Sequence, residues 1–388
     1  MEQNLHGIVE ECAKMRRMQD HETSLLSSFG PTLAAWQRTH GRHSFSWQRY
    51  STPYERWLSE VMLQQTRTTT VEGYFRKFLE EFPTVKDLAA ASEDEVQALW
   101  AGLGYYSRAR NLHKAAQVVA QRGGRFPETA EGLAELPGVG PSTAGAIAAF
   151  CYGERAVMCD GNAKRVLARV CAVPGAIGER AFEKAVWEAA ESLLPSSDDM
   201  AAYTQGLMDV GAEICRKKNP LCEECPVRAL CRARAEGTME LYPGPRTKRE
   251  RPVREATLFF TYADDGVLLR KKTEKGVWHG LWLPPLSESS YDAGEALGLS
   301  SNSILWQRVG EAWPHDFTHY RLIVTPVVVR LSPGVRLEGW RSVSRQERAQ
   351  FGMPAPVAQY WPTADAVEAR LSASAYGSRC AAPGSGGE

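Results

Sequence analysis

The segment TAEGLAELPGVGPSTAGAIAAF, residues 129–150, contains two helical patterns joined by a turn with two glycines. Gly138 and Gly140 let a ligand approach the backbone, and the free N–H groups at the start of the second helix can face an anion. The same pattern is typical of a plain turn between two helices. A basic, cysteine-containing segment later in the chain favours the phosphate-binding interpretation.

Helical patterns continue on both sides of this turn and indicate an all-helical domain over 31–241, after a polar N-terminal extension, 1–30. Apolar residues recur with helical spacing within 57–62, 71–79, 96–103 and 166–170. Asp160 stands before one of these helices and could simply be its N-cap. In a functional interpretation the same helix end keeps the Asp160 carboxylate ionised.

Four cysteines lie close together, with the spacing C-x6-C-x2-C-x5-C, at Cys215, Cys222, Cys225 and Cys231. A zinc site usually has two separated C-x2-C pairs, whereas only one occurs here. One compact loop with four thiolates favours a single four-iron, four-sulfur cluster. Because Arg and Lys residues surround the cysteines, we expect the cluster to have a structural role and to position DNA.

Several motifs together resemble the iron–sulfur branch of the helix-hairpin-helix DNA glycosylases. The turn 136–142, the sequence Asp160-Gly-Asn162, and the four cysteines carry this resemblance. The segments 57–66 (WLSEVMLQQT) and 102–112 (GLGYYSRARNL) are similar to the adenine glycosylases of the MutY type. The resemblance implies a base excision repair enzyme that hydrolyses adenine from double-stranded DNA where adenine is mispaired with 8-oxoguanine or guanine.

Cleavage of a purine N-glycosidic bond requires an acid that protonates the base and an anion that stabilises the cationic sugar. By resemblance, Glu60 is the acid that later activates water, and Asp160 is the anion. The apolar neighbours of Glu60, which are Trp57, Leu58 and Val61, favour the neutral form of its side chain. Without the motif, a solvated glutamate on a helix surface would be the ordinary interpretation.

The resemblance also assigns residues that contact DNA. Gln65 and Tyr105 match residues inserted into the duplex, and Lys164 is either a phosphate contact or a plain surface lysine. Trp47, Arg49 and Gln205 match positions around the flipped adenine, and the amide of Gln205 can pair with the adenine edge. The entry segment His43-Ser-Phe45-Ser46-Trp47 departs from the Leu-Pro-Trp of many relatives.

Ser142 distinguishes between two activities. Related glycosylase/lyases carry a lysine at this position, and that lysine attacks the sugar to form a Schiff base. A serine cannot do so, and the sequence therefore predicts a monofunctional glycosylase. The alternatives are a pyrimidine or mismatch glycosylase of the same fold and a non-catalytic iron–sulfur DNA-binding protein.

A second, α+β domain is expected over 255–365, after a basic linker, 242–254. Strands are predicted over 256–262, 267–270 and 320–331, with Pro326 at an edge or a bulge. The domain resembles the Nudix-like domain of the same family but lacks the Nudix hydrolase motif. Phe317, Thr318 and His319 match residues that sense 8-oxoguanine; otherwise they form an ordinary hairpin.

Composition is consistent with this two-domain scheme. The chain has 388 residues, of which 43% are hydrophobic, and it carries 46 basic and 46 acidic side chains. A uniformly basic nucleic-acid binder is therefore excluded, and local patches must hold phosphate. The tail 366–388 is expected to be disordered. We expect a cytoplasmic, nucleoid-associated bacterial monomer without membrane contact.

Overall fold

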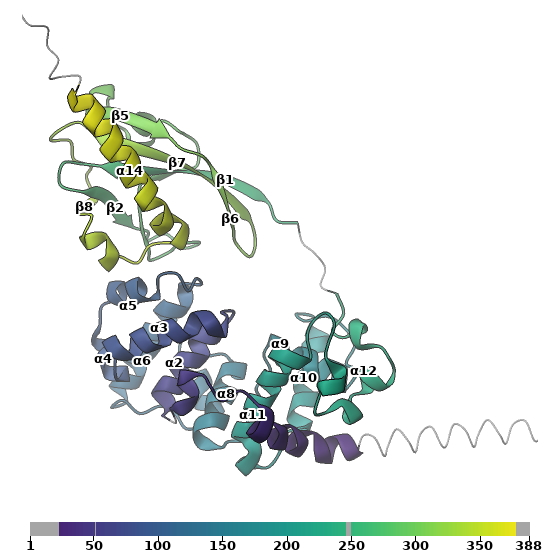
Figure 1. Cartoon of the computed structure of the whole chain (residues 1–388). Coiled ribbons are helices and arrows are strands. Elements are labelled where there is room, and N and C mark those ends of the chain that lie inside the picture. The colour runs from purple at the N-terminus through teal and green to yellow at the C-terminus, as the bar shows by residue number, and fades with distance from the viewer. Residues whose placement is uncertain (1–22, 51, 246–249, 378–388) are drawn as a thin grey trace, which may run out of the picture. The chain divides into compact units, whose positions relative to one another are not determined.

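The computed structural model describes residues 23–50, 52–245 and 250–377, with side chains up to 373 (Figure 1). The chain forms two compact units. Residues 1–90 and 111–248 make up the first unit, and residues 91–110 and 249–388 make up the second. The sequence had placed 91–110 in the helical domain, whereas their contacts group them with the second unit.

The first unit is helical. It begins with a helix over 23–40 and continues with η1 (Ser46–Arg49), α2 (Pro53–Leu63), α3 (Thr68–Glu81), α4 (Val85–Ala90), the later part of α6 (Ser107–Gln121), α7 (Ala130–Ala134), α8 (Pro141–Tyr152), α9 (Gly161–Val170), α10 (Arg180–Ser192), α11 (Met200–Asp209), a π-helix η3 (Val210–Ile214) and α12 (Arg232–Ala235). The helical patterns predicted within 57–62, 71–79 and 166–170 lie in α2, α3 and α9, and the two helices predicted within 129–150 are α7 and α8.

The prediction of a polar extension over 1–30 is wrong for residues 23–30, which form the first turns of a helix. Leu25 and Phe29 are buried in the core of the unit because they lie on one face of that helix. Residues 1–22 lie outside the described residues.

Helix α8 lies at the centre of the first unit, where it packs against α2, α7 and α11. Its residues from Ala144 to Ala149 are all buried. Gly145 allows the segment before α9 to approach closely, because a Cβ atom at Gly145 would lie 2.0 Å from the carbonyl oxygen of Val157. This contact holds the segment that leads to Asp160 against α8.

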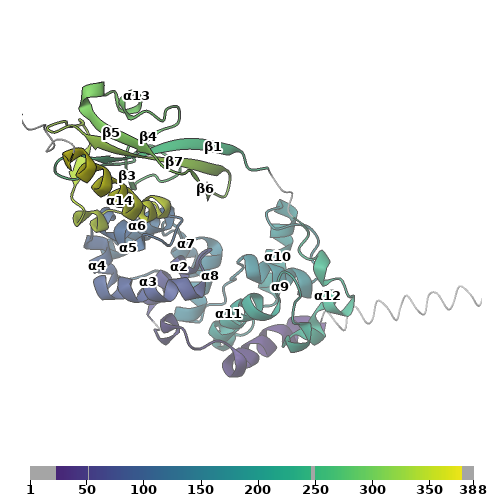
Figure 2. The same cartoon turned by 45° about the horizontal axis from the view of Figure 1, so that its top comes forward.

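The second unit is built on a mixed sheet, in which the long strands β1 (Val253–Tyr262) and β7 (Arg321–Leu331) pair in parallel. Helix α14 (Ala355–Gly377) packs on β1 and β7, and α13 (Ala293–Leu297) covers the opposite face (Figure 2). The remaining elements are α5 (Glu93–Trp100), β2 (Val267–Lys271), β3 (Trp282–Leu283), β4 (Leu286–Ser287), β5 (Ile304–Val309), β6 (Trp313–Asp316) and β8 (Arg341–Val343).

Three sequence predictions for this unit need correction. Pro326 lies in an internal strand, at the interruption where β7 changes partner from β5 to β6, so that its missing N–H disturbs neither ladder. The last two linker residues, Val253 and Arg254, belong to β1. Residues 366–377 are helical because they continue α14, where Glu368 pairs with Arg330; residues 378–388 lie outside the description.

Candidate active site

An open cavity of about 710 Å³ lies in the first unit, between the end of α2 and the starts of α8 and α9. Both carboxylates singled out in the sequence, Glu60 and Asp160, line it. The other lining residues are Arg42, Leu63, Gln64, Gln65, Thr66, Arg67, Thr68, Ser142, Thr143, Ala146, Met158, Gly161, Asn162, Arg165, Met208 and Ala212.

Glu60 is buried on α2, with 9% of its surface exposed. Removal from water raises the pKa of Glu60 to about 7, since burial penalises the charged form. The nearby Arg56 guanidinium lowers this pKa in part, and the negative charge of Asp160 raises it further. Near neutral pH the carboxyl group can therefore both hold and release a proton.

Asp160 has the opposite environment. It is exposed and caps α9, where its Oδ1 accepts hydrogen bonds from the backbone amides of Asn162 (2.9 Å) and Ala163 (2.7 Å). The cavity therefore combines one buried carboxyl group with a raised pKa, Glu60, and one exposed carboxyl group that caps a helix, Asp160.

A buried ion pair that the sequence did not reveal borders the same cavity. Asp209 has no exposed surface. It accepts hydrogen bonds from the backbone N (2.9 Å) and Nε (2.8 Å) of Arg42 and from Nε2 of Gln205 (2.8 Å). An aspartate on the buried face of α11 is a sequence indication of a paired charge, but nothing in the sequence identifies Arg42 as the partner.

The other predicted adenine contacts lie outside the set of described residues that line the cavity. Trp47 is buried and stacks on Phe45, with 4.7 Å between ring centroids. The Arg42 guanidinium lies 5.2 Å from the centre of the same Phe45 ring. Arg49 is exposed at the end of η1. Trp47 therefore supports Arg42 indirectly, through Phe45.

The predicted DNA contacts occupy different positions. Gly138 has a left-handed φ of 79°, and a Cβ atom there would lie 2.7 Å from Cβ of Asn111. Gly140 is the N-cap of α8 and has open space around it. Lys164 forms an ion pair with Glu183. These contacts favour a structural role for Lys164 and leave the start of α8 accessible.

Two residues expected to enter the duplex share an unusual backbone conformation. Gln65, which follows α2 at the cavity, is exposed and has a φ of 58°. Tyr105, in the second unit, is 48% exposed and has a φ of 48°. Left-handed conformations are strained for residues other than glycine and occur often at functional sites.

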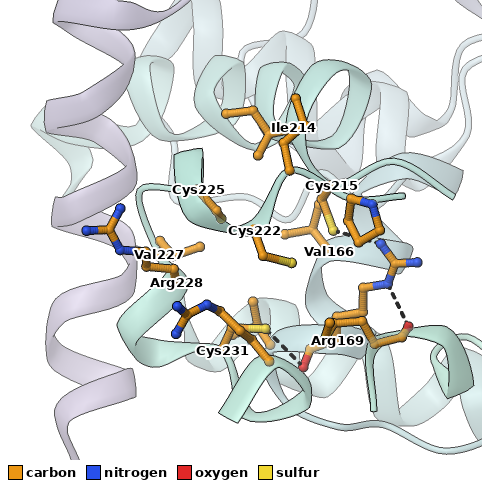
Figure 3. A pocket seen from close by; sticks show the side chains of 14 residues that line it. Val166, Arg169, Ile214, Cys215, Cys222, Cys225, Val227, Arg228 and Cys231 are labelled. Atoms are coloured by element: carbon orange, nitrogen blue, oxygen red, sulfur yellow. Dashed lines mark hydrogen bonds between the residues drawn. The ribbon is translucent and has the colours of Figure 1, made fainter. Parts of the chain in front are cut away.

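The four clustered cysteines surround one pocket (Figure 3). Val166, Val170 and Ile214 form part of its apolar wall. Arg169 binds the surrounding loop, donating to the carbonyls of Arg216 (2.7 Å) and Lys217 (3.2 Å) and to Sγ of Cys215 (3.3 Å).

Within the described ranges, no three His, Cys, Asp or Glu side chains converge on the position of a single metal ion. Thiols that surround a pocket without meeting at one point fit a group of several atoms better than one zinc ion, whose sulfur ligands lie only about 2.3 Å from the metal. The residues present therefore fit an iron–sulfur cluster.

In the second unit, Phe317, Thr318 and His319 form the turn between β6 and β7, closed by a hydrogen bond from the backbone N of Phe317 to the carbonyl of Tyr320 (2.9 Å). Thr318 and His319 are exposed. Phe317 is half-buried and its ring meets that of Trp278 edge to face, with 5.6 Å between centroids. The turn therefore exposes two polar side chains, Thr318 and His319, next to the packed ring of Phe317.

Two family models match this chain, and they support the resemblance. Residues 58–192 match the model of the HhH-GPD superfamily base excision DNA repair proteins, and residues 256–363 match that of the NUDIX domain. A solved structure of a thermostable thymine-DNA glycosylase is similar over 55% of this chain and 99% of that chain, with 29% identity and a TM-score of 0.49.

None of the helices in the described residues could span a membrane.

Two curated relatives are adenine DNA glycosylases. The protein from Buchnera aphidicola subsp. Acyrthosiphon pisum is 34% identical over 304 residues, which cover 78% of this chain and 87% of that protein. The human protein is 46% identical over 183 residues, which cover 47% of this chain and 33% of that protein. These matches confirm the family and the two-part fold class expected from the sequence. The chain belongs to the adenine DNA glycosylase family.

Proposed function

We propose that this chain is a monofunctional DNA glycosylase that hydrolyses adenine from double-stranded DNA where adenine is paired with 8-oxoguanine or guanine. The observation that carries the proposal is the pairing, in one open cavity, of a buried carboxyl group whose pKa is raised to about 7 with an exposed carboxyl group that caps a helix. Adenine must leave the base stack to reach these groups.

Glu60 protonates the departing base. A carboxyl group with a pKa near 7 is half protonated at neutral pH, which suits a group that must first donate and then accept a proton. After departure of the base, the Glu60 carboxylate activates the attacking water.

Asp160 stabilises the cationic sugar. Its Oδ1 accepts both hydrogen bonds that the backbone amides of the helix cap donate. Oδ2, for which the described residues supply no hydrogen bond, then faces the positive charge that develops as the base leaves. The fixed anion acts in the transition state without rearranging.

Arg42 contacts the extruded base. It lines the cavity, and both its backbone N and its Nε are fixed by the buried Asp209, so its remaining guanidinium N–H groups are preorganised. Gln205 is fixed by the same carboxylate. Trp47 and Phe45 support this arrangement from behind, and we assign no base contact to Arg49.

Phosphate is held at the start of α8, where Gly140 has open space around it and the N–H groups of the first helical turn have no intrahelical acceptor. Gln65 fills the space left in the duplex by the extruded base. Thr318 and His319, exposed above Phe317, contact the opposite 8-oxoguanine.

We assign one four-iron, four-sulfur cluster to Cys215, Cys222, Cys225 and Cys231, because their side chains surround one pocket without meeting at a single point. Bound there, it would cross-link the loop 215–231 and hold its basic side chains in place. Arg169 orders the same loop from within, through its hydrogen bonds to three successive residues.

A glycosylase assay across base pairings tests the proposal. Duplexes with A opposite 8-oxoguanine, A opposite G, and T or U opposite G are incubated with the protein and divided, one half receiving alkali. We expect abasic product only from the adenine duplexes, with strand breaks only after alkali. Release of a pyrimidine would favour a mismatch glycosylase, and binding without base release would favour the non-catalytic alternative.

The sensing role of the hairpin is tested separately. Replacing the exposed side chains in Thr318→Ala and His319→Ala should lower the rate on A opposite 8-oxoguanine more than the rate on A opposite G. Ser301→Ala, at an exposed serine elsewhere in the same unit, is the control. Equal losses on both duplexes would contradict a role in sensing the opposite base.

A further inference from the structure

Residues 101–106, here called the wedge loop, are held by hydrogen bonds within the second unit. Trp100 donates from Nε1 to the carbonyl of Gly104 (3.1 Å), and Arg108 donates from Nη2 to the carbonyls of Leu103 and Gly104 (both 3.2 Å). The buried Arg108 guanidinium also lies 5.6 Å from the centre of the Tyr105 ring. These contacts keep Tyr105 exposed in its left-handed conformation.

Two further hydrogen bonds tie the wedge loop and the start of α6 to the C-terminal part of the unit. Tyr106 donates its hydroxyl to the carbonyl of Met353 (2.9 Å). Arg110, on the first turn of α6, donates from Nη1 to the carbonyl of His279. The wedge loop therefore depends on residues that lie far from it in the sequence.

The residue before His279 contacts the hairpin that carries Phe317. Trp278 is 9% exposed and has a φ of 63°. Its ring packs against Phe317 (5.6 Å) and against His315 (6.1 Å). A buried tryptophan in this conformation is held by its surroundings, so its backbone has little freedom to move independently of its ring.

Gly280 shows how closely Arg110 packs on this segment. A Cβ atom at Gly280 would lie 3.3 Å from Cδ of Arg110, and the φ of Gly280 is 78°. Three successive residues thus link two sites: Trp278 contacts Phe317, His279 supplies the carbonyl that Arg110 binds, and Gly280 leaves room for the Arg110 side chain.

We propose that Arg110 is a positioning residue, which couples recognition of the base opposite adenine, at the hairpin of Phe317, to the setting of Tyr105 through the Trp278–His279 segment. A displacement of Phe317 moves the Trp278 ring and with it the His279 carbonyl. Arg110 must follow, because a half-buried guanidinium that loses its acceptor is destabilised. The inference rests on the proposed function, which places the opposite base at the hairpin of Phe317, and on the predicted insertion of Tyr105 into the duplex.

The test measures single-turnover rate constants of the full-length protein on A opposite 8-oxoguanine and on A opposite G. Arg110→Met should lower the ratio of the two rate constants at least about fivefold, the lower end of common coupling between sites. Arg110→Lys, which keeps a cationic donor, should lower it less. Arg122→Met, at an exposed arginine beyond the end of α6, is the control and should leave the ratio unchanged.

A double-mutant cycle separates coupling from a loss of local structure. Phe317→Leu should lower the same ratio, and the combination with Arg110→Met should lower it no further than the larger single effect. Single effects that multiply, or an unchanged ratio in Arg110→Met, would overturn the coupling. A wild-type protein that releases no adenine from either duplex would instead refute the proposed function.

Discussion

The hydroxyl of Ser142 accepts a hydrogen bond of 2.9 Å from the backbone amide of Cys159, the residue directly before Asp160. Ser142 stands on the first turn of α8, and Asp160 caps α9. The Ser142 side chain therefore joins the two helix starts that border the cavity. Related lyases carry their nucleophilic lysine at this same position.

Replacing this serine by lysine should change the chemistry. In Ser142→Lys an amine enters the cavity that holds Asp160, close enough to attack the sugar carbon once the base has left. We expect strand breaks without alkali and a protein–DNA adduct trapped by borohydride. Ser142→Ala serves as the control and should give no adduct. Failure of the lysine variant to form one, while still releasing adenine, would argue against the position assigned to Ser142.

Glu60 should control the pH dependence of base release. Because the protonated form is required and its pKa is about 7, the single-turnover rate should fall as pH rises through 7 and approach a tenfold loss per pH unit above 8. Glu60→Gln can neither protonate the base nor accept a proton from water, and should release adenine about 10²–10⁴-fold more slowly. A rate that stays constant from pH 6 to 9 would contradict the role of Glu60 as acid.

The same side chain should destabilise the fold at alkaline pH. The pKa of Glu60 in the folded protein is about 7, above the reference value of 4.5 that applies to the unfolded chain. Below pH 4.5 Glu60 is protonated in both the folded and the unfolded protein. Above pH 4.5 it ionises readily in the unfolded protein, whereas burial opposes its ionisation in the folded protein. Glu60→Gln should therefore increase the free energy of unfolding at pH 8 by on the order of 3 kcal/mol, and not at pH 4. Urea denaturation at the two pH values measures this difference, and an equal change at both would exclude titration as its cause.

Asp160→Asn separates capping from catalysis. Asparagine caps a helix about as well as aspartate, so the free energy of unfolding should change by less than about 1 kcal/mol. The loss of negative charge should slow adenine release by about 10²–10³-fold. Asp292→Asn, at the N-cap of α13 in the second unit, is the matched control, with little effect on either quantity. A fully active Asp160→Asn variant would leave Asp160 as a helix cap alone.

The cysteine pocket should hold iron. Protein purified without oxygen is expected to contain about four irons and four sulfides per chain. It should be brown, because the cluster absorbs broadly at the blue end of the visible spectrum. Cys222→Ser should lower the iron content, whereas Cys151→Ser, outside the pocket, should not. One zinc per chain and no iron would exclude the cluster.

Local features of the sequence predicted much of the fold. Helix starts, the glycine turn before α8 and the cap at Asp160 depend on neighbours within a few residues, so their patterns are visible in the chain itself. The cysteine spacing identified a candidate metal site for the same reason. The extent of α14 beyond residue 365 was missed, because a run of small and polar residues resembles a disordered tail until its contact with Arg330 is known.

The sequence by itself therefore determined the family, the helix-turn-helix over 129–150, the three main strands of the second unit, and the chemical groups available for catalysis. Only the tertiary structure decided how those groups behave. Burial among α2 and its neighbours raises the pKa of Glu60, Asp209 fixes an arginine 167 residues away, and residues 91–110 join the C-terminal unit. Solvation and electrostatic interaction depend on distance in space, and residues far apart in the chain carry no local pattern that reveals it.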